Sequence, residues 1–222
     1  MTRVKICGVC DPADARRVAD AEAWALGMIF WPGSPRACSL EAAEQIGAEL
    51  HRRLEVTGVF VNATLDEVAY TADRCRLALL QLHGDEGPAY CREAARRTGA
   101  RVMKAARVRD AAQVQDLQRF ATDLHLLDTY SPRAPGGSGE SFDWELVRLH
   151  RRGPPVVLAG GLTADNVGTA IEAARPFAVD VASGTEAVPG RKDPAKLTAF
   201  LQAVEVADER LRPPVAHTEP AA

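Results

Sequence analysis

Eight short apolar runs recur along this 222-residue chain, and their spacing is the feature that most limits its fold. Successive runs start about 25 residues apart, and alanine-rich stretches with apolar residues at every third or fourth position separate them. Strands that alternate with helices of this length predict βαβ units and a parallel sheet. Eight such units favour a closed α/β structure, a single (β/α)8 barrel, over an open doubly wound sheet. The runs begin at Val4, Trp24, Val56, Leu77, Val102, Leu124, Val156 and Ala178.

Capping residues mark several predicted helix starts. Asp11 stands directly before Pro12, and Thr64 stands three residues before Glu67, which is the spacing of a capping box. The apolar pattern fades after Leu201. We therefore expect residues 1–205 to form one barrel domain and residues 206–222 to form a disordered tail.

Charge and cysteine content exclude several classes of protein. The net charge is −3 with acidic and basic residues interspersed, so the chain lacks the basic footprint expected of a nucleic-acid-binding protein. No apolar stretch approaches the roughly 20 residues that a membrane span needs, and no secretory apolar segment precedes the first run. Five cysteines, an odd number, suit a reducing compartment. We expect a cytoplasmic protein that binds neither nucleic acid nor membrane.

Polar residues within the apolar runs are candidates for the barrel interior. Side chains alternate along a strand, so each run has an inward and an outward face. A layer of satisfied polar groups would explain most of these residues, and the neighbouring first and eighth strands predict an ion pair between Lys5 and Asp180. Cys7 and Asp128 differ because they end their strands, where the active sites of such barrels lie. The residues expected to point inward are Lys5, Cys7, Gln81, His83, Lys104, Asp128 and Asp180.

Two glycine-containing turns predict a site for a phosphorylated small molecule. Gly160 and Gly161 follow the seventh run, and Ser183 and Gly184 follow the eighth. Glycine lets backbone N–H groups approach an anion, and the loops after strands seven and eight are the usual phosphate site of these barrels. A long Gly-, Ser- and Pro-rich loop, residues 129–144, directly follows Asp128, and we expect it to cover the substrate.

The pair Cys7 and Cys10 allows three interpretations: a redox pair, half of a zinc site, or one catalytic thiol with a neighbour. Nothing else in the chain resembles a thioredoxin unit. A zinc knuckle would need a second pair, and Cys38, Cys75 and Cys91 lack that spacing. The single catalytic thiol is favoured, and no metal is expected.

Segments along the whole chain resemble the phosphoribosylanthranilate isomerase family of tryptophan biosynthesis. They cover residues 4–201 in the family's order. The resemblance implies a (β/α)8 fold and an Amadori rearrangement of N-(5-phosphoribosyl)anthranilate to 1-(2-carboxyphenylamino)-1-deoxyribulose 5-phosphate. The segments are VKICG, GMIFWPGSPRACS, VTGVFVN, LLQLHGDE, LLDTYSPRAPGGSGESFDW, VVLAGGLTADNV and VDVASGTEAVPGRKDPAKLTAFL.

The resemblance also implies roles for individual residues. Cys7 resembles the family's general base, Asp128 its general acid, and Arg36 the residue that holds the anthranilate carboxylate. His83 is predicted to bind substrate. The phosphate would lie against Gly160, Gly161, Ser183 and Gly184.

The implied chemistry suits these residue types. A partly buried Asp128, its pKa raised by desolvation, could protonate the furanose ring oxygen and open the sugar to a Schiff base. A thiolate at Cys7 could then remove the C2 proton, and Lys5 is a candidate to favour that thiolate. No metal or redox cofactor is needed, so none is expected. We expect a monomer, with a homodimer as the alternative.

Other functions remain open at this stage. A related phosphate-binding barrel of histidine synthesis would use paired aspartates, yet the first strand here ends in Cys7. Indole-glycerol-phosphate synthesis would need a catalytic lysine, which would be Lys104. A non-catalytic phosphosugar-binding barrel would not need both Cys7 and Asp128.

Overall fold

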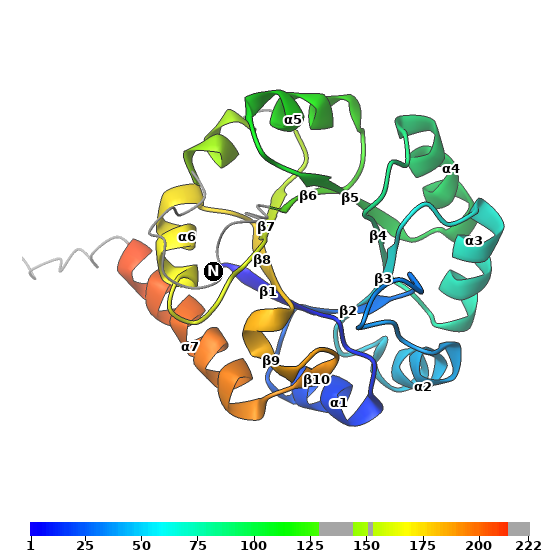
Figure 1. Cartoon of the computed structure of the whole chain (residues 1–222), viewed down its shortest axis with the longest axis horizontal. Coiled ribbons are helices and arrows are strands. Elements are labelled where there is room, and N and C mark those ends of the chain that lie inside the picture. Colours follow the sequence, from blue (N-terminus) through cyan, green and yellow to red (C-terminus); the bar gives the residue numbers. More distant parts are fainter. Residues whose placement is uncertain (129–143, 151–152, 213–222) are drawn as a thin grey trace, which may run out of the picture.

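Eight parallel strands form a closed barrel in chain order, so that β1 pairs with both β2 and β8 (Figure 1). This computed structural model describes residues 1–128, 144–150 and 153–212. The predicted (β/α)8 architecture is confirmed, and each of the eight predicted runs overlaps one barrel strand. The strands are β1 (Arg3–Cys7), β2 (Ala25–Ile29), β3 (Glu55–Phe60), β4 (Leu79–Leu82), β5 (Arg101–Arg107), β6 (Leu124–Asp128), β7 (Val156–Ala159) and β8 (Ala178–Val181).

Helices surround the barrel in an outer ring, as Figure 1 shows. After β8 the chain forms a small hairpin of β9 (Glu186–Val188) and β10 (Arg191–Lys192) before the last helix. No described helix combines the length and hydropathy needed to cross a membrane. The helices are α1 (Pro12–Asp20), α2 (Leu40–Leu50), α3 (Leu65–Arg74), α4 (Pro88–Thr98), α5 (Ala111–Asp116), α6 (Val167–Ala174) and α7 (Pro194–Leu211), with the 3-10 turns η1 (Leu117–Arg119), η2 (Trp144–Leu149) and η3 (Ser183–Thr185).

The predicted caps begin their helices by satisfying free N–H groups. The carboxylate of Asp11 accepts hydrogen bonds from two backbone N–H groups of α1. Thr64 and Glu67 form the complete predicted capping box at α3. Helix α6 has Asn166 as its N-cap, and the side-chain oxygen of Asn166 accepts a hydrogen bond from the Thr163 backbone N–H in the turn before the helix.

The core has two apolar layers, one inside the barrel and one between strands and helices. Alternation along β4 illustrates the division: Leu79 belongs to the inner cluster, whereas Leu80 and Leu82 belong to the outer one. Most of the inner cluster lies away from the carboxyl ends of the strands, where Cys7, Gln81 and Asp128 point inward. Its members are Leu79, Met103, Ala105, Leu124, Leu126, Val157, Ala159 and Ala178.

The prediction that Lys104 points into the barrel is wrong. Its neighbours Met103 and Ala105 belong to the inner cluster, and Val102 belongs to the outer one. Lys104 therefore lies on the outer face of β5, where its ammonium group donates to Glu86 at 2.8 Å and to two backbone carbonyls. β5 carries apolar residues on both faces, so alternation alone could not reveal which face is inward.

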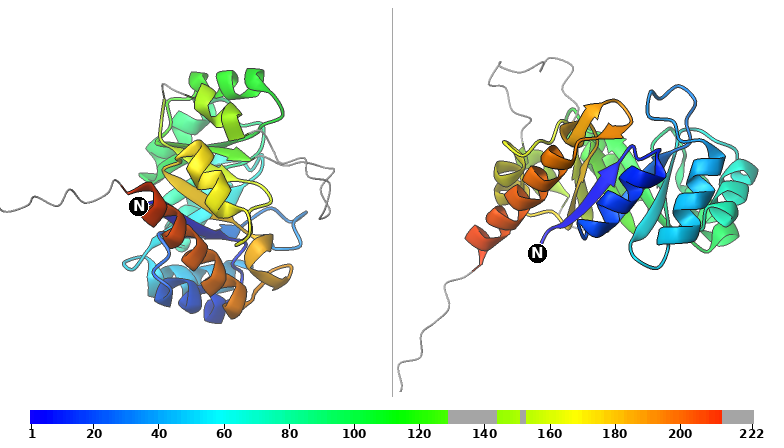
Figure 2. Two further views of the ribbon diagram at one scale, coloured as in Figure 1. Left: turned by 90° about the vertical axis from the view of Figure 1, so that its left-hand side faces the viewer. Right: turned by 90° about the horizontal axis from the view of Figure 1, so that it is seen from below.

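The predicted boundary between barrel and tail at residue 205 is also wrong, because α7 continues to Leu211. Ala207 is buried, and Asp208 accepts hydrogen bonds from the backbone N–H and the hydroxyl of Thr2. Both views of Figure 2 show the end of α7 beside the N-terminus. The helix therefore extends to where it meets the start of the chain. Residues 213–222 of the predicted tail lie outside the described part of the structure.

Candidate active site

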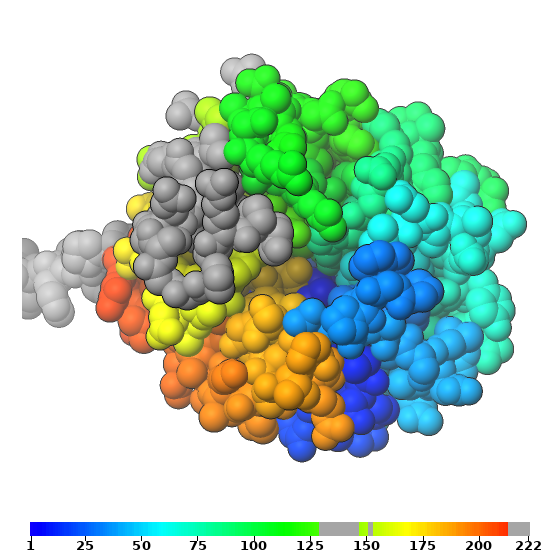
Figure 3. All heavy atoms as spheres, viewed as in Figure 1, coloured from blue at the N-terminus to red at the C-terminus, as the bar shows by residue number. Residues whose placement is uncertain are grey.

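A cavity of about 320 Å³ lies at the carboxyl ends of the barrel strands. Figure 3 views this side of the molecule, where the loop after β2 in blue approaches the segment after β8 in orange. Seven of the eight residues predicted for the site line this one cavity. They are Cys7, Arg36, His83, Asp128, Gly160, Gly161 and Ser183.

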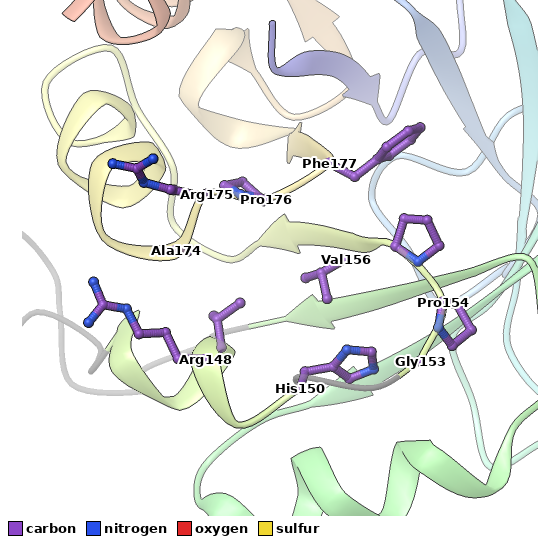
Figure 4. Close-up of a pocket in the computed structure, with 11 residues that line it drawn as sticks. Arg148, His150, Gly153, Pro154, Val156, Ala174, Arg175, Pro176 and Phe177 are labelled. Carbon is purple, nitrogen blue, oxygen red and sulfur yellow. The ribbon is translucent and has the colours of Figure 1, made fainter. Parts of the chain in front are cut away.

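A larger cavity of about 600 Å³ lies at the opposite end of the barrel, around the starts of β7 and β8. Figure 4 shows its lining, which includes Arg148, His150 and Arg175. The described lining residues include no carboxylate and no thiol, so this cavity offers no acid–base pair for catalysis. The smaller cavity is the candidate active site despite its size.

Lys5 and Asp180 form the predicted ion pair inside the barrel, with 2.8 Å between the ammonium nitrogen and a carboxylate oxygen. The two residues are register partners on β1 and β8. Burial alone would lower the pKa of Lys5, but the charges of Asp180 and Cys7 outweigh that effect and raise it. Lys5 therefore remains an ammonium ion although its side chain is fully buried.

The Cys7 thiol lies beside this ammonium group, in space that Gly27 leaves open. A Cβ atom on Gly27 would lie 2.8 Å from the Lys5 nitrogen and 2.9 Å from the Cys7 sulfur. Burial raises the pKa of Cys7, and the nearby positive charges of Lys5 and Lys192 reduce that rise without reversing it. Lys5 acts as the sequence predicted, but it does not by itself make Cys7 a thiolate.

Cys10 has a different partner from Cys7. Its thiol donates to the backbone carbonyl of Gly190 at 3.1 Å, in the turn between β9 and β10. All five cysteines are free thiols. This arrangement fits a single thiol at the cavity with a neighbour that anchors a loop.

Asp128 ends β6 and connects to a chain of polar groups on β4 and the loop after it. Gln81 donates its amide N–H to Nδ1 of His83 at 2.8 Å, so the ring hydrogen is on Nε2. That nitrogen lies 3.3 Å from Oδ2 of Asp128. The amide oxygen of Gln81 is buried without a hydrogen-bond partner in the described part of the chain. His83 thus orients Asp128 as well as lining the cavity.

Arg36 reaches the cavity from the loop after β2 and pairs with Glu186. Nε and Nη2 of Arg36 donate to the two carboxylate oxygens at distances of 2.7–3.0 Å. The Glu186 side chain is 3% exposed, whereas that of Arg36 is 22% exposed. The sequence indicated Arg36 but not this buried partner.

Lys192 is the second buried residue that the sequence analysis missed. Its ammonium group donates to the carbonyl oxygen of Cys7 at 2.7 Å, to that of Ala182 at 3.1 Å and to Glu186 at 3.2 Å. The only sequence signal was the turn pair Pro189 and Gly190, which precedes the basic residues Arg191 and Lys192 after β8. That pattern is also typical of an exposed hairpin, so it did not indicate burial.

The glycine turns predicted to bind phosphate border the same cavity, with one exception. Gly160 and Gly161 have positive φ angles of 98° and 62°, which favour glycine. Gly184 does not line the cavity. A Cβ atom there would lie 2.1 Å from the carbonyl oxygen of Leu162, so glycine allows the loops after β7 and β8 to pack closely.

Two sequence predictions stay untested: that residues 129–144 cover the substrate, and that the protein binds no metal. The proposed substrate-covering loop, residues 129–144, lies outside the described residues except for Trp144. Within the described residues, no group of three or more His, Cys, Asp or Glu side chains could hold a metal ion.

Comparison with protein families identifies one match over most of the chain. The family model for N-(5'phosphoribosyl)anthranilate (PRA) isomerase matches residues 4–203. An N-(5'-phosphoribosyl)anthranilate isomerase of Citrifermentans bemidjiense is 49% identical over 201 residues, which cover 90% of this chain and 96% of that protein. An isomerase of the same name from Geobacter metallireducens is 45% identical, covering 91% of this chain and 98% of that protein.

Solved structures give the same picture. Phosphoribosyl anthranilate isomerase from Thermotoga maritima is 40% identical with a TM-score of 0.84, covering 93% of this chain and all of that chain. A phosphoribosyl anthranilate isomerase in complex with reduced 1-(o-carboxyphenylamino)-1-deoxyribulose 5-phosphate is 37% identical with a TM-score of 0.82, at the same coverage. A third structure contains monomers generated from the dimeric Thermotoga maritima isomerase.

Proposed function

The chain belongs to the N-(5'-phosphoribosyl)anthranilate isomerase family, an enzyme family of tryptophan biosynthesis, and on this premise we propose how its residues perform the reaction. The reaction is the Amadori rearrangement of N-(5-phosphoribosyl)anthranilate to 1-(2-carboxyphenylamino)-1-deoxyribulose 5-phosphate. One observation carries the assignment of roles: Cys7 and Asp128, from strands β1 and β6, line the same 320 Å³ cavity.

Asp128 is the general acid. It donates its proton to the furanose ring oxygen, the bond from C1 to that oxygen breaks, and the nitrogen lone pair forms a C1=N iminium ion. Hydrogen bonding to His83 holds the carboxyl group in one orientation. Asp128 is 20% exposed, so it is partly shielded from water while it faces the cavity.

Cys7 is the general base. The positive iminium nitrogen acidifies the proton on C2, and its charge favours a thiolate at Cys7 in the complex although burial favours the thiol in the free protein. The thiolate takes the C2 proton, and the electron pair of that bond neutralises the iminium ion. The resulting enolamine tautomerises to the ketone product. These steps transfer protons within one substrate and call for no redox cofactor.

The remaining site residues bind the two anionic ends of the substrate. Arg36 suits the anthranilate carboxylate because a guanidinium group donates two parallel hydrogen bonds to it. Gly160, Gly161 and Ser183 suit the phosphate because they surround the cavity after β7 and β8. We assign Gly184 to the phosphate loop as the residue that lets its backbone pack closely, and His83 to both substrate and Asp128.

The outer position of Lys104 argues against the alternative synthase reaction. A lysine acid would have to face the substrate, but the Lys104 ammonium group is occupied by Glu86 and two carbonyls on the helix side of the barrel. The presence of both a thiol and a carboxyl group in the cavity likewise favours turnover over binding alone.

Complementation of an isomerase-deficient tryptophan auxotroph tests these roles. We expect wild type to restore growth and both Cys7→Ala and Asp128→Asn to fail, with kcat of the purified variants lowered about 10²- to 10⁴-fold. Cys10→Ser and Asp116→Asn are matched controls outside the cavity and should complement. Growth with both active-site variants would contradict the assignment, and failure of well-expressed wild type would reopen the question of substrate.

A further inference from the structure

The hairpin of β9 and β10 places two buried charged residues, Glu186 and Lys192, behind Arg36. We propose that Glu186, balanced in charge by Lys192, is a positioning residue that presents Arg36 to the aromatic carboxylate of the substrate. This inference rests on the proposed function of Arg36 as the carboxylate-binding residue. The inference also explains why Arg36 has the buried carboxylate of Glu186 next to it.

The geometry of the pair leaves one edge of the guanidinium group for a second carboxylate. Glu186 occupies the edge formed by Nε and Nη2 of Arg36. A guanidinium group has a second edge, formed by Nη1 and the other hydrogen of Nη2, that can also bind a carboxylate with two hydrogen bonds. Within the described residues, no hydrogen bond uses Nη1. Glu186 therefore fixes the plane of the group and directs the second edge.

The stem of Arg36 is held as firmly as its head. A Cβ atom on Gly8 would lie 2.7 Å from Cδ of Arg36, so the stem packs directly over the backbone of Gly8. Gly8 follows Cys7 at the end of β1 and has a positive φ of 74°. The rotational freedom of a long arginine side chain is thus removed before substrate arrives, which lowers the cost of binding.

Lys192 explains why the Glu186 anion does not cancel the attraction of Arg36 for substrate. Its ammonium group and the Gly190 N–H both donate to Oε1 of Glu186, at 3.2 and 3.3 Å. Lys5 with Asp180 and Lys192 with Glu186 form two neutral pairs. One positive charge, that of Arg36, remains for the incoming carboxylate.

The Lys192 ammonium group also connects Glu186 and Arg36 to β1, the strand that carries Cys7. Lys192 donates to the carbonyl of Cys7 and to that of Ala182, at the ends of β1 and β8. Its backbone N–H donates to Asp14 in α1 at 2.8 Å. The hairpin therefore holds Arg36 at a fixed position relative to Cys7, so the two ends of one substrate are recognised together.

The experiment compares two substrates that differ only in the carboxylate. One is N-(5-phosphoribosyl)anthranilate, and the other is the analogue made from aniline, which lacks the carboxylate. For Glu186→Gln we expect kcat/KM on the anthranilate substrate to fall about 10- to 100-fold, while kcat/KM on the aniline analogue changes by less than about threefold. Glu186→Asp keeps the charge but shortens the reach, so we expect the same selective loss. Glu44→Gln, which breaks an exposed arginine pair with Arg74, is the matched control and should leave both values unchanged.

The Glu186 variants test the positioning role, and the Arg36 variant tests the proposed function. Equal losses on both substrates for the Glu186 variants would show a merely structural role and overturn the inference. Arg36→Gln tests the proposed function separately, because it should reduce the preference for the carboxylated substrate to about one. If Arg36→Gln leaves that preference intact, Arg36 is not the carboxylate-binding residue, whatever Glu186 does. If Glu186→Gln does not fold, Glu186→Asp provides the same comparison.

Discussion

The environment of Cys7 depends on Gly27, a residue without a side chain. The Cys7 thiol and the Lys5 ammonium group share the space opposite Gly27 on β2, which no larger residue could leave open. The barrel interior at this level holds the Lys5–Asp180 ion pair beside the Cys7 thiol. Close packing of this kind means that adding one methyl group displaces a reacting atom.

We therefore expect Gly27→Ala to impair catalysis more than folding. The new Cβ atom would collide with the Cys7 sulfur and the Lys5 nitrogen, so kcat should fall at least about tenfold. The free energy of unfolding should fall by about 1–3 kcal/mol, the usual cost of overpacking. Steady-state kinetics and urea denaturation measure the two effects.

Gly87→Ala is the matched control for Gly27→Ala. It lies before α4, and a Cβ atom there meets nothing within 4 Å. We expect kcat to be unchanged. Equal activity of both variants would show that the site tolerates displacement of Cys7.

At the scale of single elements, hydrogen bonds of polar side chains hold helices and loops against the outer face of the barrel. His125 on β6 illustrates this in the outer layer: one ring nitrogen contacts His150 at 2.7 Å and the other donates to the carbonyl of Phe120 at 3.0 Å. Both imidazole rings are buried, and no catalytic group contacts them. Such a pair stabilises the fold only while it is neutral.

This pair predicts a loss of stability in mild acid. Burial lowers the pKa of His125 from 6.5 to about 4, so below pH 6.5 the unfolded chain takes up a proton that the native state takes up only near pH 4. The stability that the neutral ring provides is complete above pH 6.5. The free energy of unfolding should therefore fall by roughly 3 kcal/mol between these values. Urea denaturation at a series of pH values measures this slope.

Comparison with His125→Gln isolates the contribution of His125, because other groups titrate in both proteins. We expect the variant to show a smaller decrease between pH 6.5 and 4 than wild type. His51→Gln, on the end of α2, controls for the removal of a histidine elsewhere. Identical slopes in wild type and His125→Gln would contradict the assignment.

The sequence predicted a residue's position well where the alternation within its own strand determines it. It predicted positions poorly where contacts between residues far apart in the chain determine them. The alternation in β1, β6 and β8 identified the inward positions of Cys7, Asp128 and Asp180, because each of these residues lies at or next to the end of its strand beside apolar neighbours. Lys104 was misplaced because β5 is apolar on both faces. Glu186 was missed because Arg36, its partner, lies 150 residues earlier in the chain.

At the scale of the whole molecule, the last helix joins the two ends of the described chain. The contact between Thr2 and Asp208 spans 206 residues, so no local pattern could reveal it. This contact lengthens α7 beyond the predicted boundary. It also makes the final turns of the helix part of the folded domain.

We expect a chain that ends at residue 205 to be less stable than one that ends at residue 212. The shorter chain loses the buried Ala207 and the charged hydrogen bonds of Asp208 to Thr2, which together amount to roughly 3 kcal/mol. The longer one removes only residues 213–222 and should match wild type. Thermal or urea denaturation of the two truncations decides the matter, and equal stability would contradict a structural role for the end of α7.

We also expect the protein to be a monomer of 23.8 kDa in solution. The large apolar side chains that are exposed in the described residues lie on separate elements, as with Trp31 after β2, Tyr70 on α3 and Val206 on α7. Stable dimers usually bury a contiguous apolar patch. Sedimentation velocity over a range of concentrations measures the mass, and a species of twice this mass would instead establish a homodimer.

The contact between Thr2 and Asp208 also determines where another protein could be attached. Both residues lie at the end of the barrel where β1 begins, and the cavity lies at the other end. A linker joined directly before Thr2 or directly after Arg212 therefore starts on the side that faces away from the chemistry. Fusion to a second enzyme, or immobilisation through a tag, at either of these two points should leave the entrance for substrate unobstructed.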